Sequence, residues 1–224
     1  MNNYLKYYAG KNIHIEVAGN MHHEGILVDF GSDITVLHDG KQFFYIPMAH
    51  ILHIRLSLNY VSEPDSFSQH SPIGMGADMI SYRKILENAK GLFVEIYVTG
   101  NQSVHGCIGD IFNDYILFNS PVHKSIIITI DHIKWLSLRN HNQTYYTLSK
   151  QHIRVYPSMI SAAAPTFKEQ LTKLKKNMVI LDLGFDPNKI GILQKIENNF
   201  AELVTANEET VSYNLRHLKT VHLA

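Results

Sequence analysis

Histidine is the residue type with the most obvious chemical potential in this sequence. The chain has 14 histidines among 224 residues, and His50, His132 and His217 stand at matching places in three similar stretches. A histidine repeated in this way is able to contact a ligand or nucleotide around a central axis, or to hydrogen-bond near the start of a strand. No nucleophile or carboxylate accompanies all three, since Asp131 precedes only His132. The pattern therefore favours an architectural role.

Acid–base or nucleophilic catalysis finds little support elsewhere in the sequence. Asp29 and Asp110 match each other in the first two stretches, but Lys195 takes their place in the third. General acid–base work needs a second group held nearby, and the repeat offers no second carboxylate in register. Cys107 is the single cysteine, which excludes an intramolecular disulfide and a cysteine zinc site. Its place beside a glycine on an expected strand predicts a buried small residue.

Metal binding and phosphate binding are disfavoured for similar reasons. His22 and His23 are adjacent on an expected hairpin, and His50 and His53 lie three apart on an expected strand. Neighbouring or odd-spaced strand residues point to opposite faces, so neither pair is expected to share one ion. We predict no catalytic, cofactor-binding or metal-binding residues, no cofactor and no enzymatic activity. The one basic cluster is typical of a solvated helix face and comprises Lys173, Lys175 and Lys176.

Alternating apolar residues show which elements carry the histidines. Gly25, Gly106 and Gly191 set the offsets between the three stretches, 81 and 166 positions from the first. At these offsets the alternating apolar residues match in all three, as expected for strands with one face on a core. The matched positions are Ile13, Ile15 and Val17, then Val94, Ile96 and Val98, then Val179, Leu181 and Leu183. The chain is therefore one unit written three times.

Each copy is predicted to hold a short helix followed by about five short strands joined by tight turns. Leu5, Leu86 and Leu171 occupy matching places in the helical stretch. The turns carry good turn formers such as Gly19-Asn20 and Asn198-Asn199. The copies span 1–58, 81–138 and 167–224. The exposed linker 59–80 joins the first two, and the segment 139–166, apolar enough to add a strand, joins the last two.

Overall composition narrows the possible partners. Lys and Arg together number 20, as do Asp and Glu, so no global field draws the chain to nucleic acid or to an anionic membrane. No stretch approaches the ~18 apolar residues of a membrane helix, and no signal-peptide pattern opens the chain. We expect no membrane association and no affinity for nucleic acid.

Five strands in so short a unit must bend on themselves to enclose a core, and closure also hides the strand edges. The predicted fold class is all-β with short helices, as three tandem Sm-like five-stranded antiparallel barrels, each preceded by a short helix. The stretch from Val17 to Leu56 resembles bacterial Hfq and Sm-like proteins, which bind RNA on rings of barrels. In place of their tyrosine-lysine-histidine stretch, this chain has Tyr45-Ile46-Pro47-Met48-Ala49-His50. The lysine is missing, which removes a phosphate contact.

The whole chain also resembles the spore coat protein B (CotB) family of endospore-forming bacilli, which carries consecutive copies of a barrel unit. The shared motif is a histidine, an apolar residue and a lysine before an apolar pair. It stands here as His132-Ile133-Lys134-Trp135-Leu136 and His217-Leu218-Lys219-Thr220-Val221. In the first copy, His50-Ile51-Leu52 lacks the lysine. The family's serine- and lysine-rich tail has no counterpart after Leu223.

The resemblance implies a structural, non-enzymatic component of the bacterial spore coat, made in the mother-cell cytoplasm and working by protein–protein assembly. The implied partners are other spore coat proteins. A homo-oligomer in which two chains close a six-barrel ring is a further expectation from geometry. The outer-strand residues Phe43, Ile126, Ile128 and Val211 are expected to help pack the barrels together. The alternative function is a divergent Sm/Hfq-like RNA- or nucleotide-binding module.

Overall fold

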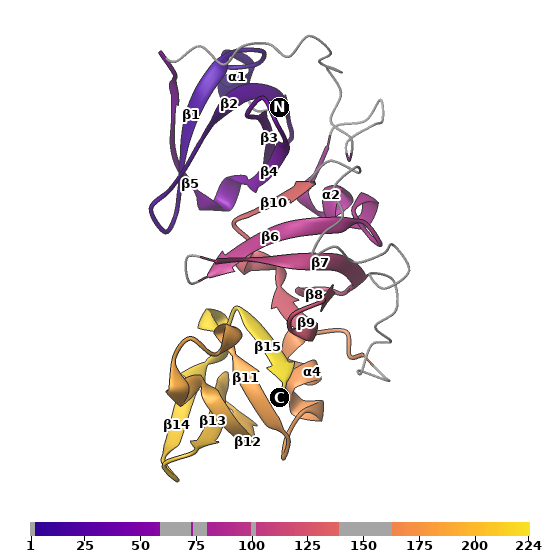
Figure 1. Cartoon of the computed structure of the whole chain (residues 1–224), viewed down its shortest axis with the longest axis vertical. Coiled ribbons are helices and arrows are strands. Elements are labelled where there is room, and N and C mark those ends of the chain that lie inside the picture. Colours follow the sequence, from indigo (N-terminus) through magenta and orange to yellow (C-terminus); the bar gives the residue numbers. More distant parts are fainter. Residues whose placement is uncertain (1–2, 59–72, 74–79, 100–101, 139–162) are drawn as a thin grey trace. The chain divides into compact units, whose positions relative to one another are not determined.

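The computed structural model describes residues 3–58, 73, 80–99, 102–138 and 163–224. These residues form an all-β structure with short helices, which confirms that part of the predicted fold class (Figure 1). The two segments expected to be linkers, 59–80 and 139–166, lie largely outside the described residues. Among the described helices, none has the length and apolar character needed to cross a bilayer.

The first copy begins with helix α1 (Asn3–Lys6), whose Leu5 is fully buried. Strand β1 (Asn12–Val17) alternates half-buried and buried residues, and its matched residues Ile13 and Ile15 are completely buried. The alternation therefore places one face on the core, as predicted. The remaining elements are β2 (Met21–Phe30), β3 (Ile34–His38), β4 (Phe43–Pro47), the 3-10 helix η1 (Met48–His50) and β5 (Ile51–Leu56).

The second and third copies repeat this order. In both, a capped helix precedes the strands: Ser81 caps α2 through the Lys84 N–H, and Thr166 forms a capping box with Glu169 on α4. The second copy comprises α2 (Tyr82–Asn88), β6 (Phe93–Thr99), β7 (Gln102–Ile111), β8 (Tyr115–Ser120), β9 (Lys124–Thr129), η2 (Ile130–His132) and β10 (Trp135–Leu138). The third comprises α4 (Phe167–Lys173), β11 (Met178–Leu181), η4 (Asp182–Gly184), η5 (Pro187–Lys189), β12 (Ile190–Glu197), β13 (Phe200–Thr205), β14 (Thr210–Asn214), η6 (Leu215–His217) and β15 (Thr220–Leu223).

A recurring backbone hydrogen bond shows that the copies are equivalent in detail. In each copy, the first residue of the 3-10 helix donates its N–H to the carbonyl of the residue in the turn before the third strand. The three bonds are Met48 to Asp33 at 2.9 Å, Ile130 to Asp114 at 2.9 Å and Leu215 to Asn199 at 2.8 Å. The repeated histidines consequently end 3-10 helices. The prediction that His50 and His53 share a strand is therefore wrong, because His50 ends η1 and only His53 lies on β5.

The third copy departs from the predicted alternation at Asp182 and Leu183. In the alternation of the matched positions, Leu183 would face the core and its neighbour Asp182 would face outward. Strand β11 instead ends at Leu181, and both residues adopt left-handed backbone conformations, with φ of 48° and 63°. Asp182 is 4% exposed. At this turn the buried Asp182 carboxylate accepts hydrogen bonds from backbone N–H groups of Lys219 and Thr220.

The three glycines that set the repeat are required by close backbone approach. A Cβ built on Gly25 would lie 2.3 Å from the His38 carbonyl oxygen on the neighbouring strand, and Gly106 and Gly191 would meet equivalent carbonyls at 2.1 and 2.3 Å. The second strand of every copy also shifts register with the third strand just beyond its glycine, after Leu27, Ile108 and Leu193. A bulge of this kind increases local bending and twist.

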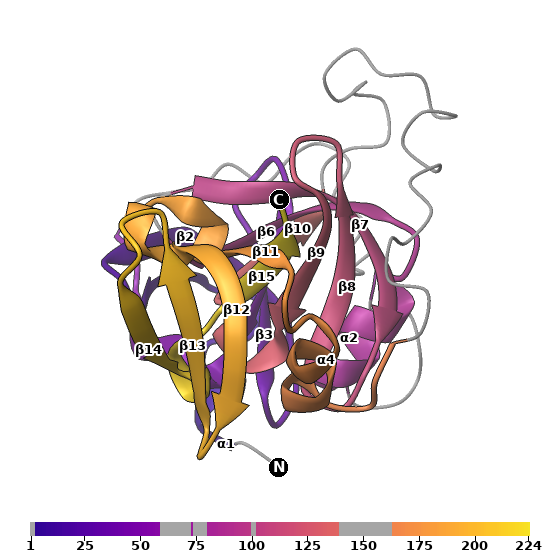
Figure 2. The same cartoon turned by 90° about the horizontal axis from the view of Figure 1, so that it is seen from below.

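The described chain divides into two compact units. The first, residues 1–97 with 134–147, has the strand order β6-β10-β4-β3-β2-β1-β5 and a core built on β1, Leu27, Leu37 and Ile46. The second, residues 98–133 with 148–224, has the order β14-β13-β12-β11-β15-β9-β8-β7 and a core that includes Leu117, Val179 and Leu203. Figure 2 shows β12, β13 and β14 as neighbouring strands of the second unit. The residues of the second copy are shared between the units.

Candidate assembly interface

The last strand of the second copy pairs with the first copy. Strand β10 lies antiparallel to β4, with Leu136 opposite Tyr45 and Leu138 opposite Phe43. On its other side, β10 pairs with β6 of its own copy. A fifth strand therefore continues the sheet of the preceding copy through main-chain hydrogen bonds. We call this arrangement, the fifth strand of one copy against the fourth strand of the copy before it, a strand junction.

A second strand junction of the same register joins the third copy to the second. Strand β15 lies antiparallel to β9, with Val221 opposite Ile127 and Thr220 opposite Ile128. Leu136 and Val221 each follow the repeated histidine of their copy by four positions, and Tyr45 and Ile127 each precede theirs by five. The two junctions are thus the same contact made twice, each inside one compact unit.

Aromatic side chains close the first strand junction. Trp135 is 6% exposed, its ring stacks on Tyr97 at 5.8 Å, and it meets Phe44 edge-on at 5.4 Å. His23 packs against Phe44 at 4.5 Å between ring centroids. Burial lowers the pKa of His23 to about 4, so its ring is neutral at pH 7 and packs as an aromatic group. Trp135 of the second copy and Phe44 of the first thus pack the two copies together.

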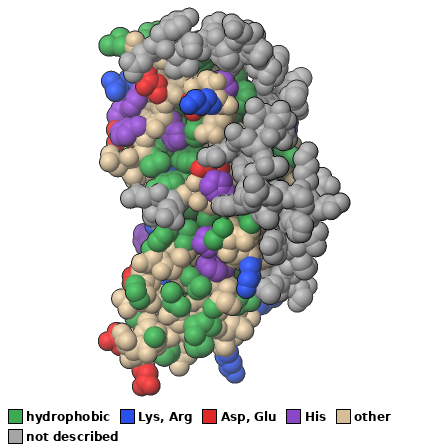
Figure 3. Space-filling view, viewed as in Figure 1, with side chains coloured by type: hydrophobic (Ala, Val, Ile, Leu, Met, Phe, Trp, Pro, Cys, Tyr) green, Lys and Arg blue, Asp and Glu red, His purple; other side chains and the backbone are tan. Residues whose placement is uncertain are grey.

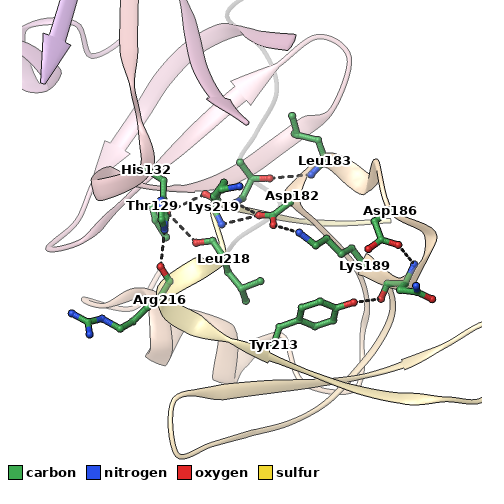
Figure 4. A network of polar contacts seen from close by, with 12 residues as sticks. Thr129, His132, Asp182, Leu183, Asp186, Lys189, Tyr213, Arg216, Leu218 and Lys219 are labelled. Carbon is green, nitrogen blue, oxygen red and sulfur yellow. Dashed lines mark hydrogen bonds and ion pairs between the residues drawn. The ribbon is translucent and has the colours of Figure 1, made fainter. Parts of the chain in front are cut away.

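Polar contacts reinforce the second strand junction (Figure 4). The Thr129 N–H donates to the Lys219 carbonyl at 3.0 Å, and the Thr129 hydroxyl donates to the Leu218 and Lys219 carbonyls at 3.2 and 3.1 Å. The Nε2 of His132 lies 2.8 Å from the carbonyl oxygen of Arg216 in the third copy. The repeated histidine of the second copy therefore contacts the next copy rather than its own last strand.

Asp182 fixes the start of β15 for that pairing. Its Oδ1 accepts hydrogen bonds from the N–H groups of Lys219 and Thr220 at 2.8 and 3.2 Å, and its Oδ2 pairs with Lys189 Nζ at 2.5 Å (Figure 4). The Thr220 hydroxyl in turn accepts from the Leu183 N–H at 3.1 Å. A single buried carboxylate thus holds both the turn after β11 and the first residues of the strand that reaches β9.

An aspartate in the turn between the second and third strands makes a further link between successive copies. Asp33 accepts from the N–H of Tyr82 at 2.9 Å, and Asp114 accepts from the N–H of Phe167 at 2.8 Å. Tyr82 and Phe167 are the first residues of α2 and α4. The N–H groups at the start of a helix favour a carboxylate, so each aspartate binds and orients the helix of the following copy.

The other residues singled out in the sequence do not converge on a reactive centre. His50 and His217 end η1 and η6 in their own copies, and His217 is exposed. Cys107 lies half-buried on β7, where burial was expected to be greater. The three clustered lysines are exposed, as a solvated helix end requires.

Histidines gather on one outer face of the first copy, toward the upper left of Figure 3, near β1 and β5. The ring of His14 lies 5.2 Å from that of His22 and 6.1 Å from that of His53, and the His53 Nδ1 lies 3.2 Å from a Glu16 oxygen. Burial and the nearby Arg55 lower the pKa of His14. Across the part of the chain described, no group of three or more His, Cys, Asp or Glu has metal-binding geometry.

A shallow pocket lies beside the second strand junction. It is lined by polar residues of the second copy and by the 3-10 helix of the third, including Asp114, Asp131, His132 and Arg216. His132 already uses a ring nitrogen on the Arg216 carbonyl.

Sequence reasoning missed Asp182, Thr129 and the two turn aspartates. For Asp33 and Asp114 a signal existed, because they stand 81 positions apart, at the offset of the first two copies. Asp182 gave no such signal, since the matching positions hold Glu16 in the first copy and Tyr97 in the second.

Comparisons with known proteins agree with the repeat architecture. A family model described as the YwrJ third domain matches residues 166–221, from the N-cap of α4 into β15. The chain is 36% identical over 222 residues to a protein of Bacillus subtilis (strain 168) named "Uncharacterized protein YwrJ", and the match covers 98% of both chains. The chain belongs to the YwrJ family.

Proposed function

We propose that this protein is a structural component of the bacterial spore coat that works by protein–protein assembly and not by catalysis. The observation that carries the proposal is the strand junction. The chain joins its own copies twice, in one register, through main-chain hydrogen bonds. Pairing of sheet edges is a common way for chains to associate, because it needs only matching backbone.

Each copy is proposed to be an Sm-like five-stranded barrel. In the first copy β1 pairs with both β2 and β5, and in the third β11 pairs with both β12 and β15. The first strand thus has the fifth strand on one side and the second on the other. The close approach at Gly25 and the bulge after Leu27 supply the bending that such a barrel needs.

The way the chain uses its histidines supports assembly over binding of RNA. His132 contacts the adjoining copy, and His23 is buried in the aromatic contacts of the first junction. Lys134 lies over the Tyr97 ring, 5.5 Å from its centroid, and so contacts an aromatic residue of its own copy. Equal numbers of acidic and basic residues give no field that would concentrate RNA.

The coat assignment draws on the resemblance to the spore coat protein B family and on the relative from a bacillus. In this proposal the protein is made in the mother-cell cytoplasm and is then deposited on the spore surface with other coat proteins. Strand junctions suit this role, since a coat requires many weak, repeated contacts.

The test is the position of a fluorescent fusion in sporulating cells of the source organism. The expected result is a ring of fluorescence around the forespore that remains on the mature spore. The matched control is the same fusion carrying Asp182→Ala, which is expected to weaken the second junction and reduce the ring. Even fluorescence through the vegetative cytoplasm, with no signal on the forespore, would refute the coat assignment.

A further inference from the structure

Two strands occupy the positions in their copies that form strand junctions elsewhere. Within the described part of the chain, each of them pairs with a neighbour on one side only. Strand β5 is the fifth strand of the first copy, and it pairs with β1. Strand β14 is the fourth strand of the third copy, and it pairs with β13. These strands end the strand orders of their units. The other fourth and fifth strands described, β4, β9, β10 and β15, are each paired across copies.

Burial differs between the joined strands and these two. Leu136 and Val221, at the centre of the two junctions, are completely buried. Ile54, at the same place on β5, is partly exposed, and Leu56 is 42% exposed where its counterpart Leu138 is 8% exposed. On β14 the pattern is the same, because Ser212 is exposed where β4 and β9 have buried residues. The positions that the two junctions bury are therefore exposed or partly exposed at the open edges of β5 and β14.

We propose that β14 of one molecule pairs with β5 of a second copy in the register of the two internal junctions. Counting from the repeated histidines, Ile54 then lies opposite Ser212, and Arg55 opposite Val211. Each molecule carries one edge of each kind, so the contact is head-to-tail, and in the proposed assembly it closes at two molecules, in a ring of six copies. This inference rests on the proposed function, which it deepens by naming the first partner as the chain itself.

The charges beside the two edges are complementary. Strand β5 carries Arg55, and the turn that opens β14 carries Glu208 and Glu209. In the proposed register Glu209 lies opposite Ser57, diagonal to Arg55, within reach of its long side chain. His217 would also meet the Ala49 carbonyl of the second molecule, as His132 meets that of Arg216. These features favour a second copy of this chain over another protein.

A cysteine trap tests the register. At the second junction the Thr129 N–H bonds to the Lys219 carbonyl, so that pair is hydrogen-bonded, and the pairs on either side alternate. By equivalence Arg55 and Val211 form a non-hydrogen-bonded pair, with Cα atoms about 4.5 Å apart, which suits a disulfide. In a Cys107→Ser background, Arg55→Cys and Val211→Cys are made in separate molecules, mixed and oxidised. The expected product is a disulfide-linked dimer that forms only in the mixture.

The matched control replaces Val211→Cys by Thr210→Cys, whose side chain points to the opposite face of β14 and is expected not to cross-link. Light scattering of the unmodified chain is expected to give twice the 25.6 kDa chain mass. Ile54→Asp is expected to reduce this mass to one chain. Ile192→Asp, at a 38% exposed residue of β12 away from either edge, is expected to leave it unchanged.

A single-chain mass for the unmodified protein would overturn the inference, as would cross-links formed only between identical variants or equally well through Thr210→Cys. These results are separable from the function itself. A monomer that still rings the forespore refutes the edge pairing and leaves the coat role standing. A dimer spread through the vegetative cytoplasm supports the edge pairing and refutes the coat role.

Discussion

Replacing Asp182 is predicted to weaken the second strand junction more than any other single polar substitution in it. In Asp182→Ala, the N–H groups of Lys219 and Thr220 lose their acceptor while they stay buried or half-buried. Each unsatisfied group costs about 1–3 kcal/mol. Alanine at a φ of 48° adds about 1 kcal/mol. Lys189 is 26% exposed and can turn to water, so its loss adds little. We expect a total of about 3–7 kcal/mol, a large share of a typical domain stability of about 5–15 kcal/mol.

Native-state hydrogen exchange is the suitable assay, because two compact units need not unfold in one step. Protection of the β15 and β9 amides is expected to fall by the full amount in Asp182→Ala. Asp182→Asn keeps an acceptor oxygen and tolerates the left-handed backbone, so it is expected to cost only about 1 kcal/mol. Equal effects of the two variants, or an alanine effect below about 1 kcal/mol, would show that the carboxylate does not hold the junction.

Three further predictions concern the copies and their partners. Gly25→Ala forces a Cβ to within 2.3 Å of the His38 carbonyl oxygen, so the free energy of unfolding in urea is expected to fall by at least about 2 kcal/mol. The control Gly91→Ala has open space around its Cβ and is strained only by its φ of 75°, so its expected loss is about 1 kcal/mol. The pKa of His23 and of His222 is lowered to about 4, chiefly by burial, whereas the unfolded value is near 6.5. The unfolded chain therefore takes up protons first, and stability falls as pH drops from 6.5 toward 4, by about 2 kcal/mol per histidine at pH 5; imidazole titrations by NMR with midpoints near 6.5 would contradict this. Finally, single-stranded RNA is expected not to bind at physiological salt, and clear binding that weakens steeply as salt rises would favour the alternative Sm/Hfq-like function.

The sequence predicted what local patterns control. Alternation placed Ile13 and Ile15 in the core, and the equal offsets revealed the repeated order of helix and strands. Local patterns could not predict the strand junctions. Leu136 pairs with Tyr45, 91 positions away, and in the sequence each looks only like an apolar strand residue. Alternation put Asp182 on the outer face of the strand, because a carboxylate at an alternating position normally faces solvent. Nothing in the sequence indicates that the strand ends at Leu181 and that the chain turns there.

The junctions also set an order of events during synthesis. Strand β4 leaves the ribosome about ninety residues before β10, the strand that covers it, which at ordinary elongation rates of about 5–20 residues per second is a delay of roughly 5–20 s. Strand β9 waits about as long for β15. A nascent chain therefore exposes an unpaired, apolar strand edge for seconds, beside identical chains on the same message. Intermolecular pairing of β4 with the β10 of a neighbouring chain is the predictable error, and it would yield swapped polymers that use the native contact.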